Sequence, residues 1–217
     1  MYTVIFDLDG TLLDTLDDLT AAVNYTLAQH GLPIRTKEEV RSFVGNGAKL
    51  LVQRASGSED IDGKLLATFQ AYYKAHAADY TRPYDGIDEL LQTLRQKHIQ
   101  VGVLSNKPDI PTKLLIKGYF GDLVELAQGA DPANGVLEKP CPNGLFALMA
   151  RLGAKKDKTV YVGDSEVDIQ TAKNAGIPCI SVTWGFKDKA FLQANGANVY
   201  AQTPMDIIKL LEEVIWH

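Results

Sequence analysis

The stretch that decides the fold runs from residue 4 to residue 15 and reads Val-Ile-Phe-Asp-Leu-Asp-Gly-Thr-Leu-Leu-Asp-Thr. Its apolar start predicts a short strand over Tyr2–Phe6, which ends abruptly in two carboxylates, Asp7 and Asp9. An ionised carboxylate is costly to bury unless it is paired or bound to a cation. Because residues two apart in a strand point to the same side, Asp7 and Asp9 are expected to face one small site. Their mutual repulsion there calls for a cation or a shared proton.

The composition of the 217 residues suits one sizeable globular domain, or a core domain with an insert, because 46% are hydrophobic and 23% are charged. A net charge of −5 argues against nucleic acid as a partner, since phosphate backbones are bound by basic faces. No apolar run approaches the ~20 residues of a membrane helix, and the N-terminus lacks a signal-peptide pattern. Cys141 and Cys179 are expected to be free thiols, neither in a disulfide nor in a zinc site. We expect a cytoplasmic monomer or homodimer with no membrane partner.

Strands and helices alternate along the chain from about residue 83 to the end. The predicted strands are Ile99–Ser105, Leu123–Gln128, Thr159–Val162 and Cys179–Val182, with a last strand at Val199. The predicted helices between and after them include Asp109–Lys117, Asn143–Leu152, Val167–Asn174 and a closing helix over Met205–Trp216. This alternation predicts an α/β fold with a Rossmann-like doubly wound, mostly parallel sheet and helices on both faces.

An all-helical segment interrupts this alternation directly after the first strand. Its predicted helices start at Leu16 and span Glu38–Phe43, Ala48–Ala55 and about Glu59–Tyr80. Asp14 precedes the first of these helices and is interpreted as its N-cap. We therefore predict a helical cap, residues 15–82, inserted into an α/β catalytic core made of residues 1–14 and 83–217.

Four segments of the predicted core deliver polar residues to one end of the sheet. They supply Asp7 and Asp9, Ser105 and Asn106, Lys139 before Pro140, and Asp164 and Asp168. In open α/β sheets, ligands bind outside the carboxyl ends of the strands, so these groups are expected in one crevice. Carboxylates without histidine or thiol make a hard oxygen site that suits Mg²⁺. A hydroxyl, an amide, an ammonium and helix N-termini make an anion site beside it, and this pairing predicts phosphoryl transfer.

The chain resembles the haloacid dehalogenase superfamily of phosphohydrolases in four motifs that occur in the family's order. These are Asp7-Leu-Asp9-Gly10-Thr11, Ser105-Asn106, Lys139-Pro140 and Gly163-Asp164-Ser165-x-x-Asp168. Within the superfamily it most resembles the phosphoglycolate phosphatase-like group, through the segment Phe43-Val-Gly45-Asn-Gly47-Ala-Lys49 of the predicted cap. The resemblance implies a Mg²⁺-dependent phosphatase that acts on a small phosphorylated metabolite, with 2-phosphoglycolate as the best single guess.

The resemblance also implies roles for the four aspartates. Asp7 would be the nucleophile, which forms an aspartyl phosphate, and a Mg²⁺ ligand. Asp9 would be the acid–base group, and its backbone carbonyl would reach the metal. Asp164 would ligate Mg²⁺, and Asp168 would hold the metal directly or through water.

Further residues of the motifs are implied to bind the phosphoryl group. Ser105 would hold the transferring group together with backbone N–H groups near Gly10, and Asn106 would lie beside it. Lys139 would bridge the nucleophile and the phosphate, and Thr11 would orient the acid–base aspartate.

The predicted cap must recognise the part of the substrate beyond the phosphoryl group. Gly45, Asn46 and Gly47 precede a helix, so free N–H groups there could meet a second anion. The basic candidates nearby are Lys49, Arg41 and Arg54. We expect this loop to close over the substrate and to exclude water before attack.

Three alternatives use the same kinds of residues. A phosphomutase of the β-phosphoglucomutase type shares every core motif and passes the phosphoryl group to a sugar hydroxyl, although Thr11 favours hydrolases by family resemblance. Dehalogenase relatives share the nucleophile, but a departing halide needs no acid, so Asp9 favours an oxygen leaving group. A receiver-like signalling module also carries an acidic cluster, a phosphorylated aspartate and a lysine. It needs neither the helical insert nor an acid–base aspartate.

Overall fold

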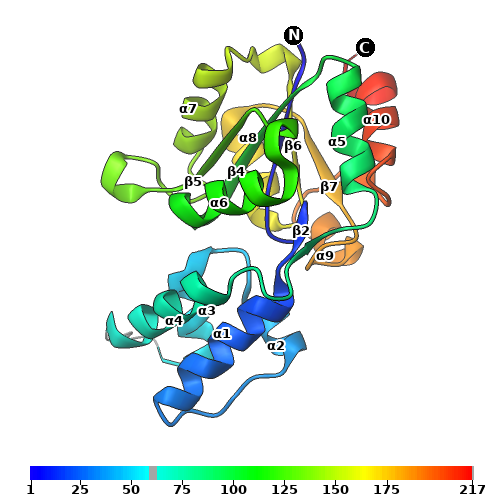
Figure 1. The fold of residues 1–217 in the computed structure, drawn as a ribbon. Helices are drawn as coiled ribbons and strands as arrows, with labels where there is room; N and C mark the ends of the chain where they lie inside the picture. Colours follow the sequence, from blue (N-terminus) through cyan, green and yellow to red (C-terminus); the bar gives the residue numbers. More distant parts are fainter. Residues whose placement is uncertain (59–62, 217) are drawn as a thin grey trace.

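The computed structural model describes residues 1–58 and 63–216. Its centre is a six-stranded sheet in the order β5-β4-β1-β6-β7-β8, and the paired neighbours in it are parallel (Figure 1). The strands are β1 (Thr3–Phe6), β4 (Gln100–Pro108), β5 (Leu126–Ala130), β6 (Thr159–Gly163), β7 (Cys179–Val182) and β8 (Tyr200–Ala201). The chain moves outward from β1 in both directions, which confirms the predicted doubly wound parallel sheet.

Helices cover both faces of this sheet. They are α5 (Ile87–Gln96), α6 (Asp109–Phe120), α7 (Asn143–Leu152), α8 (Glu166–Ala175), α9 (Lys189–Ala194) and α10 (Asp206–Leu210). Val4 and Phe6 of β1 share one hydrophobic cluster with α5, α6 and α10, whereas Ile5 shares another with α7 and α8. The alternation of side chains along β1 therefore assigns each set of helices to its own face. Within the described ranges, no helix is long and apolar enough to cross a bilayer.

Four helices form a separate unit below the sheet as drawn in Figure 1. They are α1 (Leu16–Gln29), α2 (Lys37–Phe43), α3 (Gly47–Ser56) and α4 (Gly63–His76). Their apolar faces enclose a second core, which includes Leu19, Val23 and Leu27 of α1 and Phe69 of α4. These α1 residues recur at the spacing of one helix face, which is why α1 packs on its neighbours.

The chain enters and leaves the helical unit at one place. Strand β2 (Leu13–Asp14) pairs antiparallel with β3 (Arg82–Pro83). Beside this pair, the buried carboxylate of Asp18 accepts hydrogen bonds from the N–H groups of Tyr80 and Thr81 and, at 2.7 Å, from the Thr81 hydroxyl. The chain therefore passes into the helical unit and back to the sheet through two paired strands. This supports our proposal that residues 15–82 form a cap inserted into a core of residues 1–14 and 83–217.

Some predicted boundaries are wrong. The described part of the last cap helix ends at His76, not at Tyr80, because Asp18 binds N–H groups that a continuing helix would use. The start of that predicted helix, residues 59–62, lies outside the described residues. The predicted strand from Leu123 starts at Leu126, since residues 121–123 form a 3₁₀ turn. The closing helix is α10 followed by a π-helical turn, Leu211–Ile215.

The predicted N-cap of α1 is displaced by one residue. Thr15 occupies the N-cap position, and its side chain makes no capping hydrogen bond. The Asp14 carboxylate instead accepts a hydrogen bond from Leu16 N–H at 3.2 Å, so Asp14 does satisfy a free donor of the first turn. Both cysteines, Cys141 and Cys179, are free.

Candidate active site

Asp7 stands at the carboxyl end of β1, in the middle of the sheet. Its N–H continues the ladder to β6 by donating to the Val162 carbonyl at 2.8 Å. Its Oδ1 accepts a hydrogen bond from Leu8 N–H at 2.7 Å and lies 2.9 Å from Lys139 Nζ. Burial raises the pKa of Asp7 to about 7, although Lys139 opposes the shift. The carboxylate is therefore fixed, nearly buried and next to a cation.

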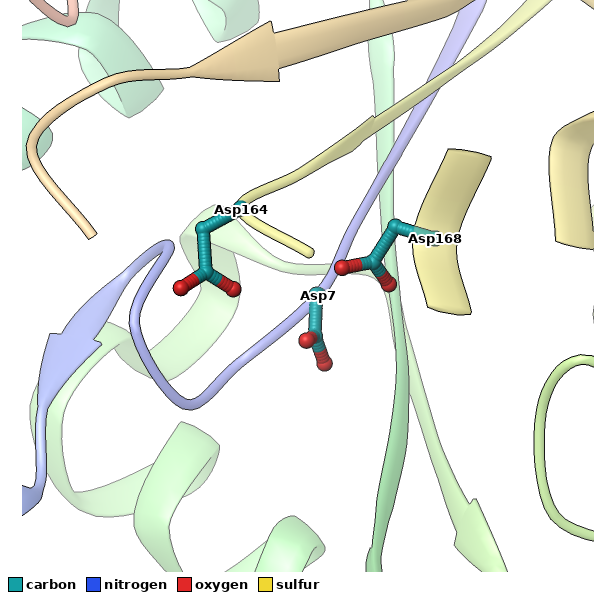
Figure 2. A group of neighbouring side chains, drawn as sticks. All are labelled: Asp7, Asp164 and Asp168. Carbon is teal, nitrogen blue, oxygen red and sulfur yellow. The ribbon is translucent and has the colours of Figure 1, made fainter. Parts of the chain in front are cut away.

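Asp164 and Asp168 join Asp7 in one buried acidic cluster (Figure 2). One carboxylate oxygen from each residue lies within 4.8 Å of the others. Asp168 Oδ2 accepts hydrogen bonds from the backbone and hydroxyl of Ser165, which closes a capping box at the start of α8. Asp164 Oδ2 accepts the N–H of Phe186 at 2.7 Å. Two segments distant in sequence, the end of β1 and the junction of β6 with α8, thus direct three carboxylates to one point.

Lys139 partly neutralises this acidic cluster. Its Nζ lies 2.6 Å from Asp168 Oδ1, 2.9 Å from Asp7 Oδ1 and 3.1 Å from the Tyr161 hydroxyl. One ammonium faces three carboxylates, and burial together with the neighbouring carboxylates raises the pKa of Asp164 well above its ordinary value. The negative charge of these buried carboxylates thus exceeds the positive charge of Lys139. A buried set of carboxylate oxygens with such an excess fits a hard divalent cation such as Mg²⁺.

Two glycines let the backbone approach the acidic cluster closely. A Cβ on Gly10 would lie 2.3 Å from Asp164 Oδ2, and Gly10 has a φ of +84°. A Cβ on Gly185 would lie 2.3 Å from the Gly10 carbonyl and 2.4 Å from Asp164 Cβ. A side chain at either position would displace the carboxylate, so glycine at residue 10 has a steric reason as well as a conformational one.

Asp9 has different surroundings from Asp7. Its carboxylate is not part of the acidic cluster found among the described residues, and its two oxygens lie 2.9 and 3.1 Å from Lys107 Nζ. Lys107 also donates a hydrogen bond to the hydroxyl of Tyr73 at 2.7 Å. The two aspartates therefore occupy separate environments. Contact between the Asp9 carbonyl and a metal stays a prediction.

The predicted phosphate-binding residues surround Asp7 at the ends of β1 and β4. Ser105 is buried, and its hydroxyl accepts the N–H of Lys107 at 3.2 Å. The Asn106 amide pairs with the backbone of Lys139, at 2.6 and 3.1 Å, and donates to the Gly45 carbonyl at 3.2 Å. Thr11 is fully buried, and no hydrogen-bond partner for its hydroxyl is found within residues 1–58 and 63–216. The roles of these residues remain predictions.

A cavity of about 580 Å³ connects these groups to the helical unit. Asp7, Asp9 and Ser105 line it from the sheet end, and Gly45 and Gly47 line it from the helical unit. Asn46 is the N-cap of α3. A Cβ on Gly47 would lie 2.6 Å from Glu138 Oε1 of the core, so this loop is already closed against the sheet end.

The basic candidates of the cap have other partners. Arg54 donates to the Phe43 carbonyl at 2.8 Å, and Arg41 lies 3.5 Å from Glu38. Lys49 interacts electrostatically with Glu138 of the core. Lys187, which we did not predict, lines the cavity and donates to the Ser42 carbonyl at 3.0 Å.

Lys107 and Tyr73 are two further cavity residues that we did not predict as part of the site. Lys107 directly follows the Ser105-Asn106 motif at the end of a buried strand, where a lysine without a partner would be costly. The position of Lys107 in the sequence could therefore have indicated that it pairs with a carboxylate of the site. Tyr73 belongs to an aromatic stripe in α4 that resembles ordinary core packing, so nothing in its sequence context distinguished it.

The fold and the site together define an enzyme of phosphoryl transfer, with a buried carboxylate cluster, an adjacent lysine and polar strand ends around one cavity. The chain belongs to the haloacid dehalogenase-like hydrolase family, whose model matches residues 4–182. It is a phosphoric monoester hydrolase similar to the phosphoglycolate phosphatases. The family and the enzyme class predicted from the sequence are thereby confirmed.

Individual relatives support this placement. A phosphoglycolate phosphatase of Pseudomonas syringae pv. syringae is 34% identical over 222 residues, covering 98% of this chain and 78% of the relative. One from Rhodospirillum rubrum is 38% identical over 194 residues, covering 84% of this chain and 80% of the relative. The crystal structure of a candidate phosphoglycolate phosphatase from Lactobacillus delbrueckii subsp. bulgaricus has a TM-score of 0.89 at 35% identity and full coverage of both chains.

Proposed function

We propose that this protein hydrolyses 2-phosphoglycolate in a Mg²⁺-dependent reaction through an aspartyl phosphate on Asp7. The observation that carries the proposal is the environment of Asp7: a buried carboxylate that lies beside Lys139 and two further aspartates and lines the cavity. Asp9, two residues away, lines the same cavity. These are the groups needed by a nucleophile, a phosphate clamp and an acid–base catalyst.

In the first half-reaction, a carboxylate oxygen of Asp7 attacks phosphorus. The bond from phosphorus to the ester oxygen breaks, its electron pair stays on that oxygen, and the oxygen takes a proton from the Asp9 carboxyl. In the second half-reaction, a water oxygen attacks phosphorus and gives its proton to Asp9. The bond to Asp7 then breaks, which restores both aspartates, and the products are an alcohol and inorganic phosphate.

Positive charge around the transferring group lowers the barrier to both steps. Lys139 holds Asp7 in place and faces the same side of the sheet end. Asp7, Asp164 and Asp168 would hold Mg²⁺, which when bound supplies charge that neutralises the phosphoryl oxygens. Ser105 supplies a hydroxyl, whereas the Gly10 N–H, which we expected to bind the phosphoryl group, donates to the Leu13 carbonyl at 2.9 Å.

The choice of substrate rests on the relatives and on the cap loop. The relatives from Pseudomonas syringae pv. syringae and Rhodospirillum rubrum, which match 98% and 84% of this chain, are named phosphoglycolate phosphatases. Helix α3, which spans 10 residues, begins at Gly47 against the cavity. The N–H groups of a helix's first turn have no intrahelical partner, so they suit the carboxylate of a small phosphate ester.

Removing Mg²⁺ tests the chemistry. We expect chelation with EDTA to abolish phosphate release from 2-phosphoglycolate and re-addition of Mg²⁺ to restore it, because the cluster then lacks its neutralising charge. The measurement is phosphate release from a panel of small phosphate esters, with a parallel assay for phosphoryl transfer to sugar phosphates. Release without metal, or transfer to a sugar hydroxyl in place of hydrolysis, would contradict the proposal.

Replacing Gly47 tests the role of the cap loop. Gly47 has a φ of +82°, and a side chain there would meet Glu138, so Gly47→Val should hold the loop away from the core. We expect KM for 2-phosphoglycolate to rise about tenfold or more, as a misplaced binding group predicts. Gly31→Val is the matched control, because Gly31 also has a positive φ, of +67°, but has open space around it. If the Gly47→Val and Gly31→Val variants had the same KM for 2-phosphoglycolate, this would contradict a role of the loop in substrate binding.

A further inference from the structure

Lys107 uses its hydrogen-bonding capacity on two neighbours. Its side chain is only 3% exposed, and its Nζ lies 2.9 and 3.1 Å from the two oxygens of Asp9. The same nitrogen donates to the Tyr73 hydroxyl at 2.7 Å. An ammonium has three donors, and these three contacts account for them. Lys107 is therefore committed to Asp9 and Tyr73, although it lies beside the cavity in which the substrate would bind.

Tyr73 reaches this pair from the helical unit. It lies on α4, is buried, and stacks on Phe69 with ring centroids 5.5 Å apart. Its ring also lies under Lys107 Nζ, which is 4.6 Å from the ring centroid. The core of the helical unit thus fixes the phenol, and the phenol fixes the lysine. Within the described ranges, Lys107 is in turn the hydrogen-bond donor to the Asp9 carboxylate.

We propose that Lys107 and Tyr73 are positioning residues for the acid–base aspartate, so that Asp9 depends for its orientation on a side chain of the helical unit. This inference rests on the proposed role of Asp9. A carboxyl has two oxygens, so one can stay on Lys107 while the other gives or takes the proton. Without the ammonium, the Asp9 side chain gains rotational freedom, and even a small misplacement of a catalytic group is costly.

The consequence depends on the leaving group of the substrate. An alkoxide needs a proton as it departs, whereas 4-nitrophenolate leaves readily without one. If Asp9 loses its orientation, the phosphorylation of Asp7 by alkyl phosphates should therefore slow far more than its phosphorylation by 4-nitrophenyl phosphate. If Lys107 had a purely structural role, its loss would lower the rates with alkyl phosphates and with 4-nitrophenyl phosphate by the same factor.

The experiment measures kcat/KM for a series of phosphate monoesters that runs from 4-nitrophenyl phosphate to alkyl phosphates. This parameter covers the steps up to formation of the phosphoenzyme. For Lys107→Met we expect kcat/KM for the alkyl esters to fall about 100-fold relative to 4-nitrophenyl phosphate, the usual size of a lost acid–base contribution. For Tyr73→Phe we expect kcat/KM for the alkyl esters to fall about fivefold relative to 4-nitrophenyl phosphate, which is the effect of one hydrogen bond.

Two comparisons separate positioning from damage to the fold. Tyr119→Phe is the matched control, because it also removes a phenol that bonds near the helical unit, at 2.6 Å to the Thr81 carbonyl, but makes no contact with Asp9. It should leave the dependence on the leaving group unchanged. On an Asp9→Asn background, Lys107→Met should cause no further selective loss for alkyl esters, since the group it positions is already gone.

The outcomes distinguish this inference from the function on which it rests. If the wild type hydrolyses the esters and Asp7→Asn does not, but Lys107→Met and Tyr73→Phe slow all esters equally or not at all, the inference is wrong and the proposed function stands. If Lys107→Met does not fold, the leaving-group dependence of Tyr73→Phe decides. A wild type that hydrolyses no ester would overturn both.

Discussion

Replacing Asp7 by asparagine should reduce turnover of 2-phosphoglycolate by a factor on the order of 10⁴ or more, because the amide cannot form the phosphoenzyme. The side chain keeps its shape, so the hydrogen bond from Leu8 N–H and the position at the end of β1 should persist. Burial and the neighbouring carboxylates raise the pKa of Asp7, so loss of its charge relieves repulsion. We therefore expect an inactive protein that is at least as stable as the wild type. The measurements are phosphate release and urea unfolding.

Asp85→Asn is the matched control for this experiment. Asp85 is exposed and lies away from the cavity, so the same chemical change there should leave the rate unaltered. Mass spectrometry must exclude deamidation of the introduced asparagine, which would regenerate the nucleophile. Wild-type turnover by the intact Asp7→Asn protein would show that another group attacks phosphorus.

Replacing Lys139 by methionine should affect both activity and stability. Its Nζ contacts Asp7 and Asp168, and its side chain is 3% exposed, so methionine would leave buried carboxylates without their cation. Breaking one side of a buried ion pair costs about 3–5 kcal/mol of unfolding free energy. We expect a loss of this size in urea unfolding with EDTA present, and phosphate release below detection, because the nucleophile is no longer held.

Lys113→Met provides a sharp comparison. Lys113 lies 2.6 Å from Asp109, the same distance that separates Lys139 from Asp168, but its side chain is 49% exposed. An exposed pair contributes about 0–1 kcal/mol, so this variant should unfold almost as the wild type does. Similar destabilisation by the two substitutions would mean that Lys139 is not needed to neutralise the acidic cluster.

The sequence was sufficient to predict which residues meet at the acidic cluster. Asp7 and Asp164 follow apolar strands, and the carboxyl ends of parallel strands lie at one edge of the sheet. Asp168 stands four residues after Asp164, in the first turn of a helix, which returns its carboxylate to the same edge. Local pattern and chain topology therefore determine this cluster, and the structure brings together the residues that the motifs indicated.

The contacts between the helical unit and the core could not be predicted in the same way. Tyr73 and Lys107 are 34 residues apart, and hydrophobic periodicity shows which face of α4 is buried but not which atom its hydroxyl will reach. Asp18 has the same difficulty: it occupies the first turn of α1, where acidic residues are common, yet it binds backbone 62 and 63 residues later. Such contacts depend on how two packed units meet.

The pairing of β2 with β3 has a consequence for how this enzyme can change. Leu13 faces Pro83 across the pair, so the two ends of the segment 15–82 are neighbours. With respect to the sheet, the whole segment is therefore inserted like a single surface loop. Insertions with adjacent ends leave the host fold intact. The segment can therefore lengthen, shrink or be exchanged while β1 still presents Asp7 unchanged. We therefore expect a hybrid that keeps this strand pair and carries a foreign insert to retain the nucleophile and to cleave 4-nitrophenyl phosphate, whose leaving group needs no proton, while it loses alkyl esters, which depend on the contact from Tyr73 to Lys107 and Asp9.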